Sequence, residues 1–264
     1  MTASPAPAPG ADPVPPDGCQ LRLLGHFDLA GAQVCALGNA EQRLLALIAV
    51  HSGALARWQA AQLLYPHATD ARAASNLRAV LWRLQRCCPA VLDVTATTIR
   101  LAPDVRVDFW TAGPTARRLI GQTATFDTHE LTEALRANLH DDLLPGWPEP
   151  WLVPERERFH QLRLHALEAL CTELTRSGWH GAAVDVGLAV VSADPLRESA
   201  RRVLIAAYLA EGNTCEAMRQ FDTFSAVLQA ELGVRPTAAL GRLLRASASS
   251  ALAAAAAERL ASTS

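Results

Sequence analysis

The C-terminal half of the chain repeats its apolar pattern with a period of 34 residues. A shift by this period superimposes Ala169 on Val203, Leu170 on Leu204, Leu174 on Tyr208, Gly178 on Gly212 and Ala183 on Ala217. The shared glycine is expected at a turn between two helices, and the shared alanine allows the helices of a pair to approach closely. Asp194-Pro195 separates the two copies, with proline at the first turn of a helix. The pattern predicts helix pairs that stack in series.

This spacing is typical of tetratricopeptide repeats, although an unrelated helical bundle is the alternative. Ahead of the repeats, two short helices are expected at 109–120 and 128–140, and a segment rich in Pro and Trp at 143–151 interrupts them. We therefore expect an all-α, tetratricopeptide-like domain over residues 109–245. Its polar side chains are either candidate partner contacts or ordinary exposed charges; those considered are Arg156, Arg158, Arg163 and Arg202.

The first half shows a different order of elements. Strands are expected at 20–29 and 32–37, with Gly31 in the turn between them. Three helices follow: one capped by Asn39 and ended by Gly53, one over 57–66 stopped by Pro66, and one from Thr69 or Asp70 to about Cys88. Residues 91–109 then alternate as two strands around a polar tip at Thr95–Thr98. This order predicts a winged helix-turn-helix domain over residues 18–108, so the fold class is mainly α with small β.

The third helix of that domain has two distinct faces. Leu77, Val80, Leu81 and Leu84 share one side. The other side carries Arg72, Ser75, Ala79, Trp82, Arg83 and Arg86, with Arg78 at its flank. In helix-turn-helix proteins such a face enters the major groove, where arginine can fork onto guanine or phosphate. The alternative is a solvated basic helix face.

The indole of Trp82 stands opposite the apolar side and needs a partner or a cover. It could stack on a sugar, contact a thymine methyl group, pack under the wing or pack against the second domain, and the sequence does not separate these. At the wing tip, Thr97 and Thr98 are further candidate DNA contacts.

Charge is distributed unevenly between the halves. Residues 18–108 hold nine arginines and six acidic residues, a net charge of +3, whereas residues 109–245 hold fourteen arginines and seventeen acidic residues, a net charge of −3. A small basic domain meets the minimum electrostatic requirement for binding phosphate.

Known catalytic and metal motifs are missing from the sequence. The chain has no lysine for a Walker motif, and it contains no GxSxG, HExxH or GxGxxG pattern and no CxxC pair. We therefore expect no enzymatic activity, no cofactor and no metal. The N-terminal residues 1–17 lack the features of a secretory signal and are expected to be disordered, and residues 246–264 form an Ala- and Ser-rich tail. Without an apolar run that could cross a bilayer, a cytoplasmic location is expected.

Sequence runs in both halves of the chain resemble a known family. The runs LRLLGHFDL, LLALIAVHSG and ARAASNLRAVLWRLQR are similar to the OmpR-class winged helix of SARP-type transcription activators. HDDLLPGWPEPWLVPERERFHQLRLHALEAL and DPLRESARRVLIAAYLAEGN resemble the bacterial transcriptional activation domain (BTAD) of that family. Carried over position by position, the recognition-helix residues are Arg72, Ser75, Arg78, Ala79, Trp82, Arg83 and Arg86.

The resemblance implies a sequence-specific, nucleoid-associated activator. Such a protein binds direct repeats in promoter DNA as a dimer, recruits RNA polymerase holoenzyme and regulates a secondary-metabolite gene cluster. The alternative is a tetratricopeptide protein-interaction scaffold whose winged helix binds DNA weakly or not at all. Salt-dependent binding to promoter fragments distinguishes the two.

Overall fold

A computed structural model of the 264-residue chain describes residues 18–31, 36–121 and 126–245. Its contacts divide the chain into two compact units. The first consists of the residues up to Thr115 together with Leu135–Leu162, and the second of Ala116–Ala134 together with the residues from Arg163 onward. The segment 135–162 therefore packs with the N-terminal residues, although it follows them by some distance in the sequence.

The first unit begins with a small sheet in the order β2-β1-β6. β1 (Cys19–Arg22) pairs antiparallel with β2 (Asp28–Ala30), and Gly25 adopts a φ of 82° in the turn between them. The hairpin thus lies entirely within 19–30, and the expectation of one strand over 20–29 was wrong because Gly25 turns the chain. Of the second expected strand, residues 32–35 lie outside the described residues, and Ala36 and Leu37 are not in a strand.

Three helices form the core of the first unit: α1 (Asn39–His51), α2 (Arg57–Leu64) and α3 (Asp70–Cys87). α1 buries Leu44, Leu45, Leu47 and Ile48 almost completely. Its N-cap residue is Gly38, not Asn39, and its C-cap residue is Ser52, whose left-handed φ of 50° takes the role expected of Gly53. The expected bounds of α3 are confirmed to within one residue.

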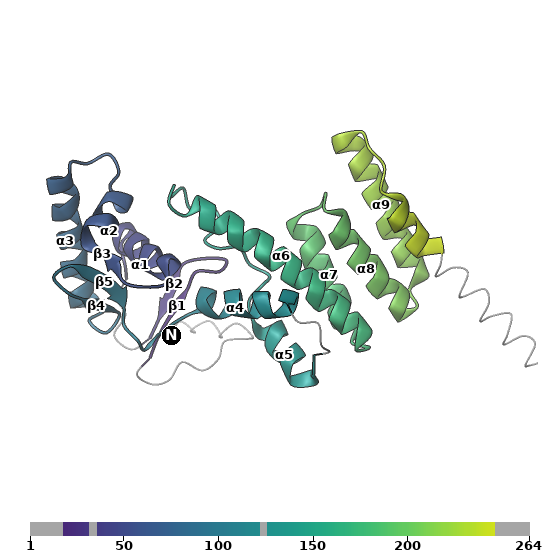
Figure 1. Cartoon of the computed structure of the whole chain (residues 1–264), viewed down its shortest axis with the longest axis horizontal. Helices are drawn as coiled ribbons and strands as arrows, with labels where there is room; N and C mark the ends of the chain where they lie inside the picture. Colours follow the sequence, from purple (N-terminus) through teal and green to yellow (C-terminus); the bar gives the residue numbers. More distant parts are fainter. Residues whose placement is uncertain (1–17, 32–35, 122–125, 246–264) are drawn as a thin grey trace, which may run out of the picture. The chain divides into compact units, whose positions relative to one another are not determined.

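The wing is a second sheet in the order β3-β5-β4, made of β3 (Leu55–Ala56), β4 (Leu92–Val94) and β5 (Thr98–Leu101). The sequence predicted two strands over 91–109, but the chain turns at Pro103-Asp104 and a third strand, β6 (Val105–Val107), joins β1 in the other sheet. The three helices and this hairpin form a winged helix-turn-helix, shown at the α1–α3 labels of Figure 1.

Residues 135–162 attach to the N-terminal sheet through backbone contacts. Leu144 N donates to Leu23 O at 2.8 Å, and Gly25 N donates to Asp142 O at 2.8 Å. Arg156 secures the same segment from α6 (Val153–Arg176) by donating to the carbonyl oxygens of Leu143, Leu144 and Trp147. Arg156 is thus a structural residue and not the exposed charge that the sequence allowed.

The second unit consists of helices. It contains the C-terminal parts of α4 (Asp108–Gly121) and α6, most of α5 (Thr128–Arg136), and the whole of α7 (His180–Ala193), α8 (Glu198–Glu211) and α9 (Thr214–Leu232). α7 packs on α8 and α8 packs on α9, as Figure 1 shows. Gly178 and Gly212 both adopt left-handed φ angles, 78° and 87°, at the ends of α6 and α8. The expected glycine turns are confirmed.

Close approach of the helices is also visible at the repeat positions. Ala183 and Ala217 are fully buried, and a Cβ on Gly187 of α7 would lie 3.2 Å from Leu204 Cα of α8. The buried Cys171 Sγ of α6 donates to Ala183 O of α7 at 3.2 Å, and burial raises the pKa of this thiol to about 12. Across the described ranges, no helix is long and apolar enough to span a membrane.

Candidate nucleic-acid interface

The exposed face of α3 brings together the predicted recognition residues. Ala73, Leu77, Val80, Leu81 and Leu84 are buried on its inner side. The exposed residues on its outer side are Arg72, Ser75, Arg78, Ala79, Trp82, Arg83 and Arg86. The separation arises because apolar residues recur every three or four positions, which places them on one side of an α-helix.

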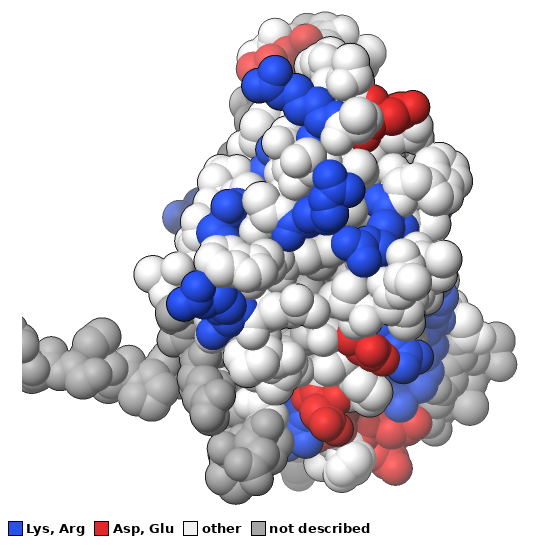
Figure 2. Space-filling view, turned by 90° about the vertical axis from the view of Figure 1, so that its left-hand side faces the viewer, with Lys and Arg blue, Asp and Glu red and all other residues white. Residues whose placement is uncertain are grey.

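Figure 2 views the molecule from the α3 side. Arginine side chains are spread over the upper and central part of this face, and acidic side chains lie mainly toward its upper edge and lower part. A surface of this kind attracts phosphate groups through long-range electrostatics.

Arg83 is not a free surface arginine. Its Nε donates to Oε1 of Glu41 at 2.5 Å, and the side chain of Glu41, in the first turn of α1, is only 8% exposed. A buried carboxylate needs a positive partner, so Arg83 compensates the charge of Glu41 and attaches α3 to α1. The guanidinium nevertheless stays about half exposed, because its side chain retains 48% of its accessible surface.

Trp82 and Arg86 form a pair on the outer side of α3. The guanidinium carbon of Arg86 lies 4.7 Å from the centre of the Trp82 ring, a cation–π contact. Trp82 remains 58% exposed. Of the possibilities that the sequence left open, packing under the wing is wrong, because so much of the indole faces solvent.

Arg72 and Arg78 complete the basic side chains of this face. Neither has a hydrogen-bond or ion-pair partner among the residues that the structure describes, and both are exposed. Their guanidiniums keep all five N–H donors for a ligand. Ser75 and Ala79 lie on the same outer side and are small, so they allow a close approach.

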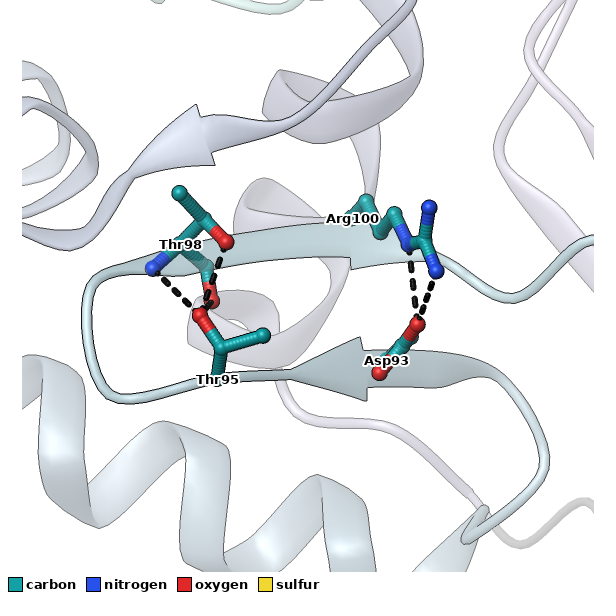
Figure 3. Close-up of polar contacts among 4 residues, drawn as sticks. All are labelled: Asp93, Thr95, Thr98 and Arg100. Carbon is teal, nitrogen blue, oxygen red and sulfur yellow. Dashed lines mark hydrogen bonds and ion pairs between the residues drawn. The ribbon is translucent and has the colours of Figure 1, made fainter.

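The wing tip is organised by Thr95, as Figure 3 shows. Its Oγ1 accepts from Thr98 N at 2.9 Å and from Thr97 N at 3.3 Å, and lies 2.8 Å from Thr98 Oγ1. The Thr98 hydroxyl therefore serves the turn, whereas the Thr97 side chain is exposed. Of the two threonines singled out from the sequence, Thr97 is the one available for contact.

Two arginines that the sequence did not single out stabilise the wing. Arg57, the first residue of α2, donates from its backbone N to Thr97 O at 2.9 Å and from Nη1 to Thr95 O at 3.3 Å. Arg100 pairs with Asp93 directly across the hairpin, with Nε 2.8 Å from Oδ2 (Figure 3). The cross-strand pair of opposite charges is a sequence signal that could have been found once the register was known.

The arrangement suits an anionic polymer. Exposed guanidiniums, a stacked indole and a rigid hairpin tip are groups that bind phosphate, bases and sugars. Within the described residues, no cluster of three or more His, Cys, Asp or Glu side chains is placed to hold a metal ion.

Comparisons with known proteins relate the chain to a family of regulatory proteins. The family model of the bacterial transcriptional activator domain matches residues 107–246. The regulatory protein AfsR of Streptomyces coelicolor is 33% identical over 102 residues, which is 39% of this chain and 10% of AfsR. The structure of Mycobacterium tuberculosis EmbR in complex with a low-affinity phosphopeptide matches with a TM-score of 0.64 at 16% identity. That match covers 88% of this chain and 65% of the EmbR chain, so this chain spans only part of either protein.

Proposed function

The chain belongs to the bacterial transcriptional activator domain family, and from this membership we propose that it is a sequence-specific DNA-binding transcription activator of the SARP type. The observation that carries the proposal is the exposed face of α3, on which Arg72 and Arg78 are unpaired among the described residues. The basic charge of residues 18–108 and the wing beside this helix support the same function.

In this proposal α3 enters the major groove with its outer face toward the bases. Arg72 and Arg78 contact guanine edges or phosphates, and Ser75 and Ala79 allow the helix to approach the base pairs. Trp82, covered on one side by Arg86, stacks on sugar or contacts a thymine methyl group. Arg83 offers its exposed nitrogens to phosphate while its Nε stays bound to Glu41.

The wing then contacts the neighbouring phosphates through Thr97, and Thr98 keeps the tip in shape. Arg57 fixes the tip relative to α2, so the two contact points of the domain keep a constant separation. Backbone contacts of this kind position a protein on the duplex, and base contacts specify the sequence.

We further propose that two protomers bind direct repeats side by side and that the helical unit recruits RNA polymerase, at the promoters of a secondary-metabolite gene cluster. A single winged helix with a net charge of +3 is expected to bind one site weakly at physiological salt. Tandem sites make the second contact effectively intramolecular, which raises avidity by about two orders of magnitude or more.

Footprinting on DNA upstream of the neighbouring genes tests the proposal. We expect protection of two half-sites in the same orientation, about 10–11 bp apart, since both recognition helices then enter from one side of the duplex. Insertion of about half a helical turn between them should abolish cooperative binding, and a full turn should restore part of it. Binding that does not depend on salt, or on the spacing, would favour the scaffold alternative.

A further inference from the structure

Arg201 occupies a core position of the helical unit. It lies in the first half of α8 and is only 7% exposed. One repeat earlier, 34 residues upstream, the equivalent position in α6 is Leu167, which is fully buried. A charged side chain therefore stands where the preceding repeat places an apolar one.

The guanidinium of Arg201 has neutral neighbours. Nη1 donates to Oε1 of Gln220 at 2.5 Å, and the guanidinium carbon lies 5.7 Å from the ring centre of the fully buried Phe224. Nε is buried without a hydrogen-bond partner among the described residues. Gln220 is held in place from its other end, since its Nε2 donates to Glu216 at 3.0 Å.

The acidic residue one turn before Arg201 does not compensate its charge. Both carboxylate oxygens of Glu198 accept from Thr237, one from its backbone N and the other from its hydroxyl. By contrast, the buried carboxylates of the first unit have arginine partners: Glu41 binds Arg83, and Glu149 binds Arg43 at 2.7 Å.

Such a charge is unfavourable in the isolated chain. A guanidinium removed from water loses hydration that a single amide oxygen and an aromatic face replace only in part. The same burial lowers the pKa of Arg201. A leucine, as at Leu167, would fill this position without that desolvation penalty.

We propose that Arg201 is a binding site for a single carboxylate group, the Asp or Glu side chain of a protein partner. With Nη1 committed to Gln220, the unused edge of the guanidinium is the one formed by Nε and Nη2. This edge presents two parallel N–H groups, the geometry that binds a carboxylate in bidentate fashion. Gln220 and Phe224 hold the guanidinium in position from α9.

A single carboxylate fits Arg201 better than the phosphate backbone of a nucleic acid. Arg201 is only 7% exposed, and residues 116–134 and 163–245 of the second unit hold eleven arginines and twelve acidic residues, so no excess of positive charge attracts a polyanion. Because Nε is covered, binding also requires neighbouring side chains to shift slightly. The inference concerns the helical unit and does not depend on whether α3 binds DNA.

Acetate, as the simplest monocarboxylate, tests the proposal on the full-length chain. The Nε–H resonance of Arg201, assigned through bonds, should shift on titration with sodium acetate but not with sodium chloride at equal ionic strength. In thermal melts acetate should raise the Tm of the wild type relative to chloride by about 2 °C or more.

Two variants make the test specific. Arg201→Leu should lose the acetate-dependent rise in Tm and should itself melt at a higher temperature than the wild type in chloride. Arg202→Leu, which removes the adjacent exposed arginine, should keep the acetate response. An unshifted Nε–H resonance, an equal acetate response in the wild type and Arg201→Leu, or a response to phosphate but not to acetate would overturn the proposal.

Discussion

Arg83 Nε donates a hydrogen bond to Glu41 Oε1, and this ion pair joins α3 to α1 across 42 positions of the sequence. We predict that Arg83→Ala lowers the free energy of unfolding by about 1–3 kcal/mol, because it leaves the buried carboxylate of Glu41 without a counterion. This loss of stability is smaller than that expected for a fully buried ion pair, since Arg83 is about half exposed. Urea unfolding followed by circular dichroism measures the change.

The double variant Glu41→Gln/Arg83→Met is the control for this pair. It removes both charges together, so it should be more stable than Arg83→Ala alone. If Arg83→Ala unfolds at the same urea concentration as the wild type, Arg83 does not compensate Glu41.

The same ion pair shows where sequence-based prediction succeeds and where it fails. The α3 face was predicted correctly, because helix periodicity and the stop before Pro89 are local properties of one segment. The partner of Arg83 was not predictable, since nothing in residues 76–86 indicates that Glu41 packs against them. The role of Thr98 was missed for a related reason: its hydroxyl engages Thr95 only once the hairpin has its register.

Strand pairing was the other feature that could not be predicted from the sequence. The parallel pairing of β6 with β1 joins residues more than 80 positions apart, for example Val107 with Leu21. Parallel pairing depends on tertiary packing, which a local alternation pattern does not encode. For the same reason the attachment of residues 135–162 to the first unit was not foreseen.

This attachment leads to a prediction about fragments. A fragment of residues 1–162 should unfold cooperatively and at a higher temperature than a fragment of residues 1–108. The shorter fragment lacks the ion pair of Arg43 with Glu149, the stacking of Phe27 on Trp147 and the hydrogen bond from Trp110 Nε1 to Ala49 O. Circular dichroism melts of both fragments measure the difference. Equal melting temperatures would show that residues 1–108 are stable on their own.

A glycine controls the separation of α7 and α8. We predict that Gly187→Val destabilises the protein by about 1–3 kcal/mol, because its side chain would collide with Leu204, including the Leu204 backbone. Gly181→Ala, in the same helix but with open space around its Cα, is the matched control and should be neutral or slightly stabilising. Chemical unfolding of both variants checks this, and an equal effect of the two would contradict it.

Asp108 makes stability depend on pH. Burial raises the pKa of this carboxyl, although its hydrogen bonds from the backbone N–H groups of Leu23, Leu24 and Phe109 act in the opposite direction. A raised pKa in the folded state means that the carboxyl stabilises the fold fully below its ordinary pKa and loses this contribution as pH rises through the folded value.

The stability of the wild type relative to Asp108→Asn should therefore fall as pH rises from the ordinary pKa of an aspartate to the raised pKa of Asp108 in the folded state. Above that pH the difference in stability should level off. Urea unfolding at a series of pH values measures it, with Asp104→Asn as a control for the loss of an exposed carboxyl in the preceding turn. A difference that grows with pH would mean that the folded state prefers the charged carboxylate.

DNA affinity as a function of salt shows directly whether the exposed face of α3 binds DNA. Fluorescence anisotropy on footprinted DNA should give a Kd for Arg72→Ala/Arg78→Ala that is about tenfold or more above that of the wild type. The logarithm of the association constant falls linearly with the logarithm of the salt concentration. This slope should become shallower by about 0.9 for each phosphate-contacting arginine that the variant removes. Arg117→Ala, which removes an exposed arginine of α4, should bind within about twofold of the wild type. If the double variant keeps both the affinity and the salt slope of the wild type, the α3 face is an ordinary solvated surface and does not bind DNA.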